Sequence, residues 1–537
     1  MPVFESLVDP AGHAFASHRK DMLALLKGVR DLEARVRSLS DERRAQFESR
    51  GQIMPRDRID FLLDNGSPFL ELAALAGLGM HEDDGRDFVM GGNIIAGVGY
   101  VSGRCCMVIC HNSAIKGGTI LPVGLKKQLR AQQIAIENKL PTIYLVESGG
   151  GNLNYQGEIF VDGGRQFANQ ARMSAAGIPQ ISVVHGSSTA GGAYIPGLSD
   201  YVIMVRNRAK VFLAGPPLLK AATGEIATDE QLGGAELHSV VSGVSDFMVE
   251  DDREGIECAR RIVASLDAAK AEVAGQVFAP PRFDPDELAG VVPVDFRKGY
   301  DVHEVLARLV DNSDFSDFKP MYGPATVCGQ ARIEGHAVAF ICNNGPIDVD
   351  GSAKAGQFIQ LMCQAGTPIV YLQNITGYMV GTDAERRGIV KHGSKMIQAV
   401  ANATVPQITI HIGASFGAGN YGMCGRSFDP RFLFAWPNNR VAVMGGEQAA
   451  KVMAIVGEEG ARKRGAEPDH AALKLSGDKL ISQFDRESTA LYVTSRVWDD
   501  GIIDPRDSRK VLAFCLRICR EGDSRKLNLN TFGVARL

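Results

Sequence analysis

The sequence has little that would mark a membrane protein, a nucleic-acid-binding protein or an unfolded chain. No run approaches the ~18 consecutive apolar residues of a membrane-spanning helix. The 58 Lys and Arg residues against 62 Asp and Glu give a formal net charge of −4, so no strong positive field attracts nucleic acid or anionic lipid. Its 45% hydrophobic and 22% charged content is typical of a globular protein. The opening MPVFESLVDPAGH has no apolar core of the secretory-signal type, so we expect a cytoplasmic protein.

The cysteines also lack a functional pattern. None of the ten forms a CxxC pair, so a zinc ribbon or a thioredoxin-type site is unsupported, and we expect no metal site in this chain. Most lie in apolar runs, which predicts buried free thiols.

Glycine, by contrast, is abundant. The 60 glycines make up about 11% of the 537 residues, against a usual ~7%. From about residue 90, short β-branched runs separated by glycines alternate with helical patterns, which favours an α/β fold. Residues 15 to about 50 repeat leucine and valine at helical spacing between charges, which predicts an amphipathic helix or helix pair, so we interpret residues 1–50 as a helical arm. The strand candidates are NIIAGVGYV, CCMVIC, TIYLV, QISVV and YVIMV.

The chain repeats itself at an offset of 227 residues. At that offset PTIYLVESGG (141–150) aligns with PIVYLQNITG (368–377), and IPQISVVHGSSTAGGAY (178–194) aligns with VPQITIHIGASFGAGNY (405–421). Identical residues occupy 11 of the 27 aligned positions. The period is too long for a solenoid, so we predict two copies of one domain, over 51–285 and 295–537. The Pro-rich, acidic stretch 279–294 is predicted to be a linker.

Each copy contains a small-residue loop between a strand and a helix start, over 186–193 and 413–420. Backbone N–H groups at a helix start have no partner within the helix and carry partial positive charge. Small side chains let a ligand oxygen reach them, which predicts a site for an anion or a developing oxyanion. Tight helix–sheet packing would also explain one such loop, although it explains the matched pair less well.

Two other motifs in the second loop point to different chemistry. Gly413-Ala414-Ser415-Phe416-Gly417 fits the GxSxG of a hydrolase, but the only later histidine is His470, in a charged stretch expected to be a surface loop. Residues 417–422 fit GxGxxG, but the acidic residue needed about 20 positions on is missing. Both alternatives are therefore poorly supported.

Three side chains near these loops allow more than one interpretation. His185 and His411 flank the two loops, one place out of register, and are either satisfied polar residues at the ends of core strands or acid–base groups. Lys116, followed by two glycines, suits either contact with an anion or simple solvation.

Several long segments, in order, resemble the carboxyltransferase β subunits of biotin-dependent acyl-CoA carboxylases. The resemblance covers nearly the whole chain. It implies two crotonase-like (ClpP/crotonase) domains in tandem, in agreement with the repeat. The segments are SAIKGGTI, LVESGG, GPPLLKAATGE (215–225), QLGGAELH (231–238), GNYGMCGRSFDPRF (419–432) and WPNNRVAVMGGEQAA (436–450).

The resemblance also implies roles for named residues. The backbone N–H groups of Gly191 and Gly192 would hold the thioester oxygen of an acyl-CoA, and those of Ala418 and Gly419 would polarise the ureido oxygen of carboxybiotin. No side-chain base is then required, because biotin itself takes the substrate proton. The expected substrate-binding residues are Lys116, Gly117, Gly149, Gly150, Gly163, Gly164 and Ala193.

The resemblance implies partners as well. The chain has neither a Met-Lys-Met biotinylation motif nor a P-loop, so biotin would be carried and charged by a separate α subunit with biotin carboxylase and biotinyl domains. Family members form a β hexamer within an α6β6 enzyme, and each active site lies between the N-domain of one subunit and the C-domain of its dimer partner.

The substrate class follows from one segment. The chain resembles the branch of the family that carboxylates the γ-methyl carbon of 3-methyl-2-enoyl-CoAs. Methylcrotonyl-CoA enzymes carry a bulky aromatic residue where this chain has Gly163. Replacing Phe by Gly opens on the order of 100 Å³, which suits a longer isoprenoid tail. We therefore expect geranyl-CoA as substrate and a role in terpenoid catabolism, with the methylcrotonyl-CoA enzyme of leucine degradation as the alternative; a further alternative is that Gly163 merely serves a turn.

Two different classes remain open. A crotonase-like hydratase or decarboxylase would need one oxyanion hole and would turn over an acyl-CoA without a biotinyl partner. A non-catalytic scaffold that keeps the fold would show no carboxylation even with a charged partner.

Overall fold

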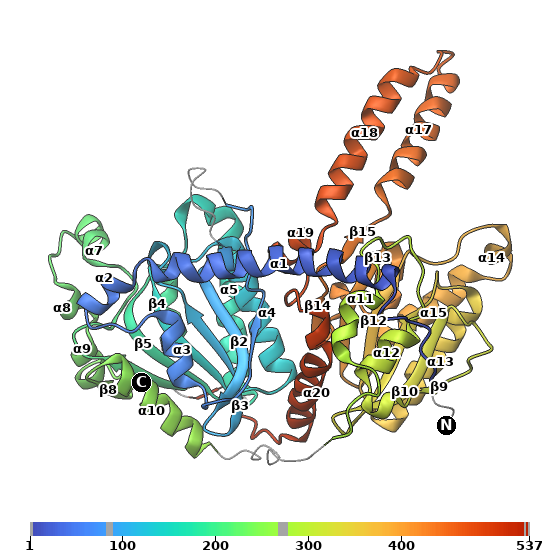
Figure 1. The fold of residues 1–537 in the computed structure, drawn as a ribbon. Coiled ribbons are helices and arrows are strands. Elements are labelled where there is room, and N and C mark those ends of the chain that lie inside the picture. The colour runs from blue at the N-terminus through green and yellow to red at the C-terminus, as the bar shows by residue number, and fades with distance from the viewer. Residues whose placement is uncertain (1–3, 82–89, 267–277, 531–532, 535–537) are drawn as a thin grey trace. The chain divides into compact units, whose positions relative to one another are not determined.

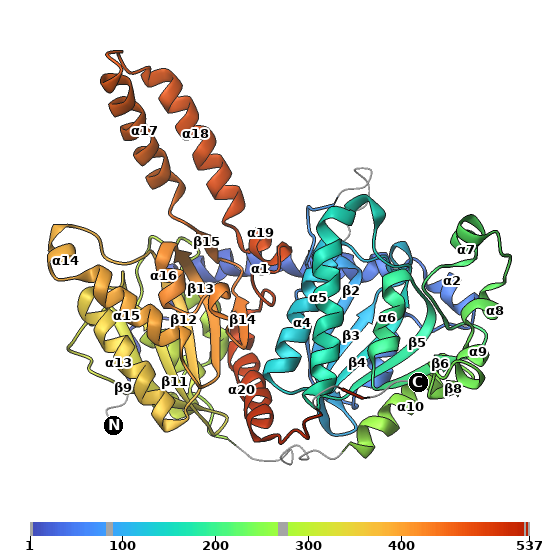
Figure 2. The ribbon, with the colours of Figure 1, turned by 180° about the vertical axis from the view of Figure 1, so that it is seen from behind.

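Figures 1 and 2 show the fold in a computed structural model, which describes residues 4–81, 90–266, 278–530 and 533–534. The chain forms two compact units. Each contains one β-sheet covered by helices, which confirms the α/β class. The N-terminal unit comprises Asp31–Gly275, Ser495–Val497 and Ile518–Leu537, and the C-terminal unit comprises Met1–Arg30, Gln276–Thr494 and Trp498–Arg517.

The N-terminal unit is built on an eight-stranded sheet, counted over the described residues, in the order β1-β2-β3-β4-β5-β6-β8, with β7 paired to β5. The first three strands are antiparallel, and the pairs from β3 onward are parallel. Helix α4 packs against β2 and β3, whereas α10 packs against β5 and β6 and lies on the other side of the sheet (Figures 1 and 2). The strands are β1 (Phe69–Leu72), β2 (Ile94–Val101), β3 (Arg104–His111), β4 (Thr142–Ser148), β5 (Gln180–Thr189), β6 (Tyr201–Val205), β7 (Lys210–Phe212) and β8 (Phe247–Val249). The helices are α3 (Pro55–Leu62), α4 (Pro122–Glu137), α5 (Gln156–Ala175), α6 (Tyr194–Leu198), α7 (Pro216–Thr223), α8 (Asp229–Gly233), α9 (Ala235–Val240) and α10 (Asp252–Ser265).

The C-terminal unit repeats this plan in a sheet that has seven strands over its described part, ordered β14-β13-β12-β11-β10-β9, with β15 paired to β13. Its central strands β12 and β13 are buried except for the half-buried Asn374, as expected for parallel strands covered on both faces. The strands are β9 (Ser316–Asp317), β10 (Thr326–Ile333), β11 (His336–Asn343), β12 (Ile369–Ile375), β13 (Gln407–Phe416), β14 (Phe432–Ala435) and β15 (Arg440–Ala442). The helices are α11 (Leu288–Val291), α12 (His303–Leu309), α13 (Val349–Ala365), α14 (Thr382–Arg386), α15 (Ile389–Ala401), α16 (Gly417–Gly422), α17 (Gly446–Lys463) and α18 (His470–Glu487).

The duplication predicted from the sequence holds at the level of strand register. In the N-terminal unit β4 pairs with β5 so that Thr142 lies opposite Gln180, and in the C-terminal unit β12 pairs with β13 so that Ile369 lies opposite Gln407. Both pairs are shifted by the same 227 residues. The irregularity after these strands is repeated too, because Ser148 lies opposite Ser188 and Ile375 opposite Ser415. The two site loops therefore leave equivalent strands at equivalent points.

The amphipathic arm is a helix pair, α1 (His13–Asp41) and α2 (Arg44–Ser49). Of the predicted apolar stripe, Leu26, Val29 and Val36 are buried, together with Met22. Three helices, α1, α19 (Ala490–Ser495) and α20 (Ser508–Ser524), have residues in both units.

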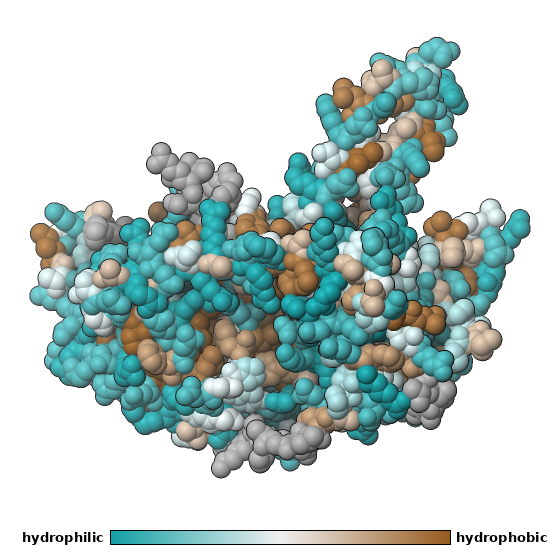
Figure 3. Space-filling model, in the orientation of Figure 1, coloured by the Kyte–Doolittle hydropathy of each residue, from teal (hydrophilic) through white to brown (hydrophobic). Residues whose placement is uncertain are grey.

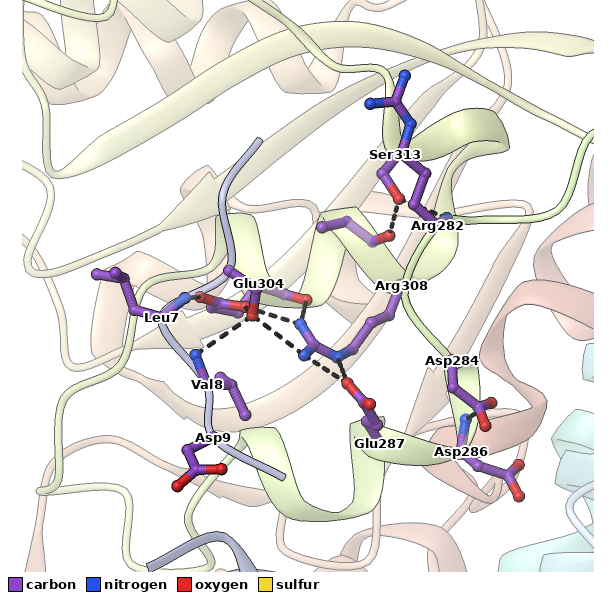
Figure 4. Close-up of polar contacts among 12 residues, drawn as sticks. Leu7, Val8, Asp9, Arg282, Asp284, Asp286, Glu287, Glu304, Arg308 and Ser313 are labelled. Atoms are coloured by element: carbon purple, nitrogen blue, oxygen red, sulfur yellow. Dashed lines mark hydrogen bonds and ion pairs between the residues drawn. The ribbon is translucent and has the colours of Figure 1, made fainter. Parts of the chain in front are cut away.

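The predicted linker over 279–294 is wrong. Leu288–Val291 within it form helix α11, and Leu288 is fully buried. Glu287 accepts hydrogen bonds from the buried Arg308, at 2.6 Å from its Nη2, and Arg308 also donates to Glu304 at 2.7 Å (Figure 4). Glu304 in turn accepts a 2.7 Å hydrogen bond from the backbone of Leu7. Proline and acidic residues made the stretch look like a linker, but it supplies a buried ion cluster that fastens residues near the start of the chain to the C-terminal unit.

The C-terminal unit carries a long helical hairpin of α17 and α18, which projects from it (Figure 1). At the corresponding place the N-terminal unit has the short helices α7 and α8. They lie in the segment that follows β7 and ends at Gly234, which pairs back with Lys210 of β7 in an isolated β-bridge. The charged stretch 458–470 was expected to be a surface loop, and this is wrong for its first part: α17 continues to Lys463, and only 464–469 form the turn.

The cysteines are unpaired, as predicted, and all except Cys363 are buried. Over the ranges that the structure describes, no helix combines the length and apolarity needed to cross a bilayer. In the same ranges, His, Cys, Asp and Glu side chains form no group of three or more that suits a metal ion.

Candidate active site

The loop after β5 forms a sharp left-handed turn. Ala190 has φ of +53°, which is rare for a residue with a side chain and costs on the order of 1 kcal/mol. The turn starts a short 3-10 helix over Ala190–Ala193, followed by α6. The Ser188 hydroxyl donates a 2.9 Å hydrogen bond to the carbonyl of Gly192 and fixes the loop from inside. The first N–H groups of this short helical segment, which include that of Gly191, have no acceptor within the segment.

The loop after β13 has the same geometry. Gly417 has φ of +55° and begins α16. A Cβ on Gly419 would lie 2.7 Å from Cγ1 of Ile375 and 3.1 Å from Cα of Gly377, so only glycine fits there. Ala418 is exposed and Gly419 buried, which matches the exposed Gly191 and buried Gly192 of the other unit.

We call each of the two small-residue loops, 186–193 and 413–420, a cradle. Two further loops lie beside the first cradle. Lys116, Gly117 and Gly118 all have positive φ, and the carbonyl of Gly117 accepts the N–H of Gly149 at 3.1 Å. A Cβ on Gly150 would lie 3.3 Å from the carbonyl oxygen of Thr189, directly before the left-handed turn. The structure thus brings together the exposed Lys116, the glycines at 117, 149 and 150, and the loop that contains Gly191, Gly192 and Ala193.

Helix α5 places Gly163 near this cradle. The ring of Phe167, one helical turn further on, lies 3.6 Å from the position of a Cβ on Gly191. A Cβ on Gly163 would meet only Ile159, at 4.0 Å, and one on Gly164 would meet nothing within 4 Å. The alternative that Gly163 serves a turn is wrong, because both glycines lie inside a 20-residue helix. Each weakens that helix by about 1 kcal/mol relative to alanine, and Gly163 leaves open space on the face that carries Phe167.

The interpretation of the GxSxG motif as a hydrolase site is wrong, because the structure places no histidine beside Ser415 among the residues that it describes. Ser415 is fully buried, its hydroxyl donates to Oε1 of Gln373 at 2.5 Å, and it accepts from Asn420 at 2.7 Å. His470 lies on the exposed surface at the start of α18, with Glu458 at 3.5 Å. A Ser–His pair cannot form from these residues within the C-terminal unit.

The two histidines next to the loops are buried, which separates them from any substrate. The expectation of a satisfied strand residue holds for only one ring nitrogen of His185: its Nδ1 shares a 2.9 Å hydrogen bond with Asp252, whereas its Nε2 has no hydrogen-bond partner within the described part of the chain. It fails for His411, because neither of its ring nitrogens has a partner among the same residues. Burial and then the charge of Arg426 lower the pKa of His411 to about 3, so its ring is neutral.

A buried ion network, which sequence reasoning missed, lies under the first cradle. The fully buried Arg58 of α3 donates to Glu147 at 2.7 Å and to Asp252 at 3.4 Å. Glu147 immediately precedes the loop of Gly149 and Gly150 at the end of β4. No motif marks Arg58, which is a single arginine 89 positions away in the sequence.

The ionisation of this network follows from its burial and its pairing. Burial alone would raise the pKa of Glu147, but the charge of Arg58 and a hydrogen bond from Ser113 hold it below its usual value. Burial and the charge of Arg58 lower the pKa of His185, so the imidazole is neutral and its Nδ1–H donates to Asp252. The network thus holds Arg58 between two carboxylates, and Arg208 lies 3.8 Å from Asp252 as a second cation.

Each unit thus contains one cradle, a small-residue loop at a helix start, at an equivalent place. Neither cradle contains an exposed histidine or carboxylate at its centre within the described residues. Such a site can stabilise an enolate or polarise a carbonyl, but it supplies no side-chain nucleophile of its own.

Comparison with known proteins identifies relatives over almost the whole chain. The model of the carboxyl transferase domain matches residues 46–532. A probable biotin-dependent acyl-coenzyme A carboxylase beta2 subunit of Mycobacterium tuberculosis is 49% identical over 92% of each chain. The biotin-dependent 3-methylcrotonyl-coenzyme A carboxylase beta1 subunit of the same organism is 46% identical over 94% of this chain and 95% of its own. Among solved structures, the beta subunit of Pseudomonas aeruginosa geranyl-CoA carboxylase is 55% identical, covers 100% of both chains and has a TM-score of 0.93.

Proposed function

The chain belongs to the carboxyl transferase family, and on that premise we propose that it moves a carboxyl group from carboxybiotin to the γ-methyl carbon of a 3-methyl-2-enoyl-CoA. The observation that carries this proposal is the pair of backbone cradles at equivalent points of two duplicated units. In a transfer between two carbonyl compounds, one such cradle would serve each of them.

The N-terminal cradle is assigned to the acyl-CoA. The N–H groups of Gly191 and Gly192 would donate to the thioester oxygen as removal of the γ-proton places negative charge on it. A donor of this kind is worth about 10²- to 10³-fold in rate, because it is oriented before the charge develops. Lys116, exposed beside the glycine loop, would contact an anionic part of the CoA. These contacts bind and orient the substrate without a side-chain base.

The C-terminal cradle is assigned to the biotin ring, and its residues fit that group. A Cβ on Gly419 would lie 3.1 Å from Cα of Gly377, and the exposed Ala418 carries only a methyl group, so the N–H groups of these two residues would be open to a ligand oxygen. Biotin, carried on a partner chain, supplies the carboxyl group and afterwards a basic ring nitrogen. The two N–H groups would donate to the ureido oxygen and so weaken the bond between nitrogen and the carboxyl carbon.

The open space beside Gly163 supports geranyl-CoA as the substrate. Gly163 lies one helical turn before Phe167, whose ring is next to Gly191 of the N-terminal cradle. An isoprenoid tail could therefore lie against α5 there without meeting a side chain at position 163. The likeness to the Pseudomonas aeruginosa geranyl-CoA carboxylase beta subunit agrees with this choice. Methylcrotonyl-CoA is the second candidate, since relatives of 45–46% identity carry that name. With geranyl-CoA the enzyme would act in terpenoid catabolism; a cytoplasmic location stays a prediction.

We also propose that the chain works as a β hexamer with biotin-carrying α subunits, as α6β6, and that each active site pairs the acyl cradle of one copy with the biotin cradle of another. Exposed apolar side chains support an assembly, because such groups on a monomer mark interaction surfaces. On the hairpin they are Val452, Met453, Ile455, Val456 and Leu475, and on the N-terminal half of α5 and the turn before it they are Leu153, Phe160 and Val161 (Figure 3 shows apolar residues along the hairpin).

Reconstitution tests the proposed function. The chain is purified with its biotin-carrying partner, and incorporation of labelled bicarbonate is measured with ATP and either geranyl-CoA or methylcrotonyl-CoA. We expect incorporation only with the biotinylated partner and a higher kcat/KM for geranyl-CoA. A preference for methylcrotonyl-CoA would select the second candidate. Turnover of an acyl-CoA by the chain alone would point to a stand-alone hydratase or decarboxylase, and no carboxylation with a charged partner would point to a scaffold.

A further inference from the structure

The buried network of the N-terminal unit links the ends of three neighbouring strands. Glu147, at the end of β4, accepts from Nη1 of Arg58 at 2.7 Å and from the hydroxyl of Ser113, which follows β3, at 2.7 Å. Asp252 accepts from Nη2 of Arg58 at 3.4 Å and from Nδ1 of His185, on β5, at 2.9 Å. A single arginine thus connects β3, β4 and β5, the strands whose loops form the acyl cradle.

These contacts lie directly behind the donors of the cradle. Ser148, next to Glu147, donates to the carbonyl of Gly118 at 2.9 Å and accepts the N–H of Gly150 at 3.1 Å. On β5, Gly186 follows His185, and a Cβ there would lie 2.6 Å from the Glu147 carboxylate. A displacement of Glu147 would therefore move both the loop of Gly149 and Gly150, through the adjacent Ser148, and the loop that begins at Gly186.

The other unit has the same arrangement without the charge. Asn374 stands at the position equivalent to Glu147, and Gly413 is equivalent to Gly186. A Cβ on Gly413 would lie 2.4 Å from Oδ1 of Asn374, and that oxygen accepts the backbone N–H of Ala414 at 3.0 Å. A neutral amide thus suffices to hold the loop of the biotin half, whereas the acyl half uses a buried ion pair.

We propose that Arg58 and Glu147 are positioning residues for the carboxyl transfer: their buried ion pair holds the three loops of the acyl cradle at the spacing that the reacting thioester needs. The inference rests on the proposed function, which assigns the N-terminal cradle to the acyl-CoA. Neither side chain touches substrate. Arg58 is fully buried, and the carboxylate of Glu147 faces inward, toward Arg58, Ser113 and Gln52.

The test uses Glu147→Gln, which keeps the shape of the side chain and removes its charge. In the reconstituted holoenzyme, isolated as the intact assembly, we expect kcat for the acyl-CoA to fall on the order of 10- to 100-fold, the range expected when a reacting group is displaced by about 1 Å. We expect the KM for free biotin, measured in the reverse direction with the carboxylated acyl-CoA as donor, to stay within twofold. Glu147→Asp and Arg58→Lys, which keep the charges, should recover part of the activity lost in Glu147→Gln and Arg58→Met.

A neighbouring ion pair gives a matched control. Arg56, on the same helix α3, holds Glu71 of β1 through two hydrogen bonds of 2.9 and 3.0 Å that touch none of the site loops. Glu71→Gln should lower the melting temperature but leave kcat of the folded assembly unchanged.

Three results would overturn the proposal. A wild-type kcat in Glu147→Gln would show that the ion pair does not position the cradle. Equal losses of kcat in Glu147→Gln and Glu71→Gln would show a general loss of stability. A raised KM for free biotin with unchanged acyl-CoA kinetics would show instead that the assignment of the two halves, and with it the proposed function of each cradle, is reversed.

Discussion

Ala190 and Gly417 lie at equivalent positions of the two units and have almost the same backbone angle, with φ of +53° and +55°. Alanine rarely adopts this conformation, whereas glycine adopts it freely. The turn is therefore kept in the N-terminal unit even where the residue does not favour it. Because strained backbone persists where the surroundings determine it, this agreement supports a shared task for the two loops.

Substitution of the buried glycines should affect the two cradles unequally. In Gly419→Ala the new methyl group would lie 2.7 Å from Ile375 and 3.1 Å from Cα of Gly377, so the loop must move. We expect kcat to fall by roughly 100-fold, as for the loss of an oxyanion donor, with an unchanged KM for the acyl-CoA. In Gly192→Ala the nearest atom is the hydroxyl of Ser188 at 3.6 Å, and we expect a loss of less than about tenfold.

Steady-state kinetics of the reconstituted enzyme check this contrast. Gly28→Ala, inside helix α1, serves as the control, because no atom lies within 4 Å of its new methyl group and alanine favours the helix. Equal effects of Gly419→Ala and Gly192→Ala would contradict the described packing.

Filling the space beside Gly163 should change the substrate preference. In Gly163→Phe the ring would project from α5 on the face that carries Phe167, where a geranyl tail is proposed to lie. We expect kcat/KM for geranyl-CoA to fall about tenfold or more, and that for methylcrotonyl-CoA to fall much less. Measuring both substrates in one preparation checks this prediction. Equal losses would remove the basis for the proposed tail site.

The C-terminal unit should be stabilised by a protonated histidine up to alkaline pH. Burial alone would lower the pKa of His303, but hydrogen bonds to Asp301 and Asp317 raise it to about 9. Because the folded pKa lies above the unfolded value of about 6.5, the stabilisation is complete below pH 6.5 and is lost as the pH rises through 9. His303→Gln should therefore cost roughly 1–2 kcal/mol at pH 6, after allowance for solvent screening, and much less at pH 9.5.

Melting temperatures of the wild type and the variant at the two pH values measure this difference. His470→Gln is the matched control, since His470 is exposed and lies 3.5 Å from its acidic neighbour. The same loss from His303→Gln at pH 6 and pH 9.5 would rule out the charged form as the cause.

The thiols should be almost unreactive in the folded protein. Burial raises the pKa of Cys106 and Cys110 to about 12, and Cys363 alone of the ten is not fully buried. With Ellman's reagent at pH 8 we expect at most one thiol to react quickly, and all ten after unfolding in guanidinium. Rapid reaction of several thiols in the native protein would contradict the described burial of the cysteine side chains.

The sequence alone predicted those parts of the molecule that repeat. Once the offset of 227 residues was found, the division into two copies and both small-residue loops followed, because equivalent residues of a duplicated domain meet the same packing demands. The offset aligns Gly192 with Gly419, whereas the roles expected of them came from the family resemblance.

Features that depend on distant pairs were not predictable. Arg58 and Glu147 are ordinary charged residues in the sequence, and only folding brings them together away from water. The stretch 279–294 looked like a linker because proline and acidic residues are typical of linkers, yet Glu287 pairs with a buried arginine. Composition indicates the local conformation that a segment prefers. The partner of a buried charge, however, depends on which distant segments the tertiary fold brings together.

Mixing two inactive variants tests the central claim most directly. One subunit carries a disabled acyl cradle, Gly191→Pro with Gly192→Pro, and the other a disabled biotin cradle, Gly419→Ala; they are co-expressed with two different tags, and the total β pool is assayed with the biotin-carrying partner. If each active site pairs the acyl cradle of one copy with the biotin cradle of another, random mixing should restore about a quarter of the wild-type activity, because half of the pairs are mixed and one of their two sites is intact. No recovery in assemblies shown to contain both tags would contradict the account.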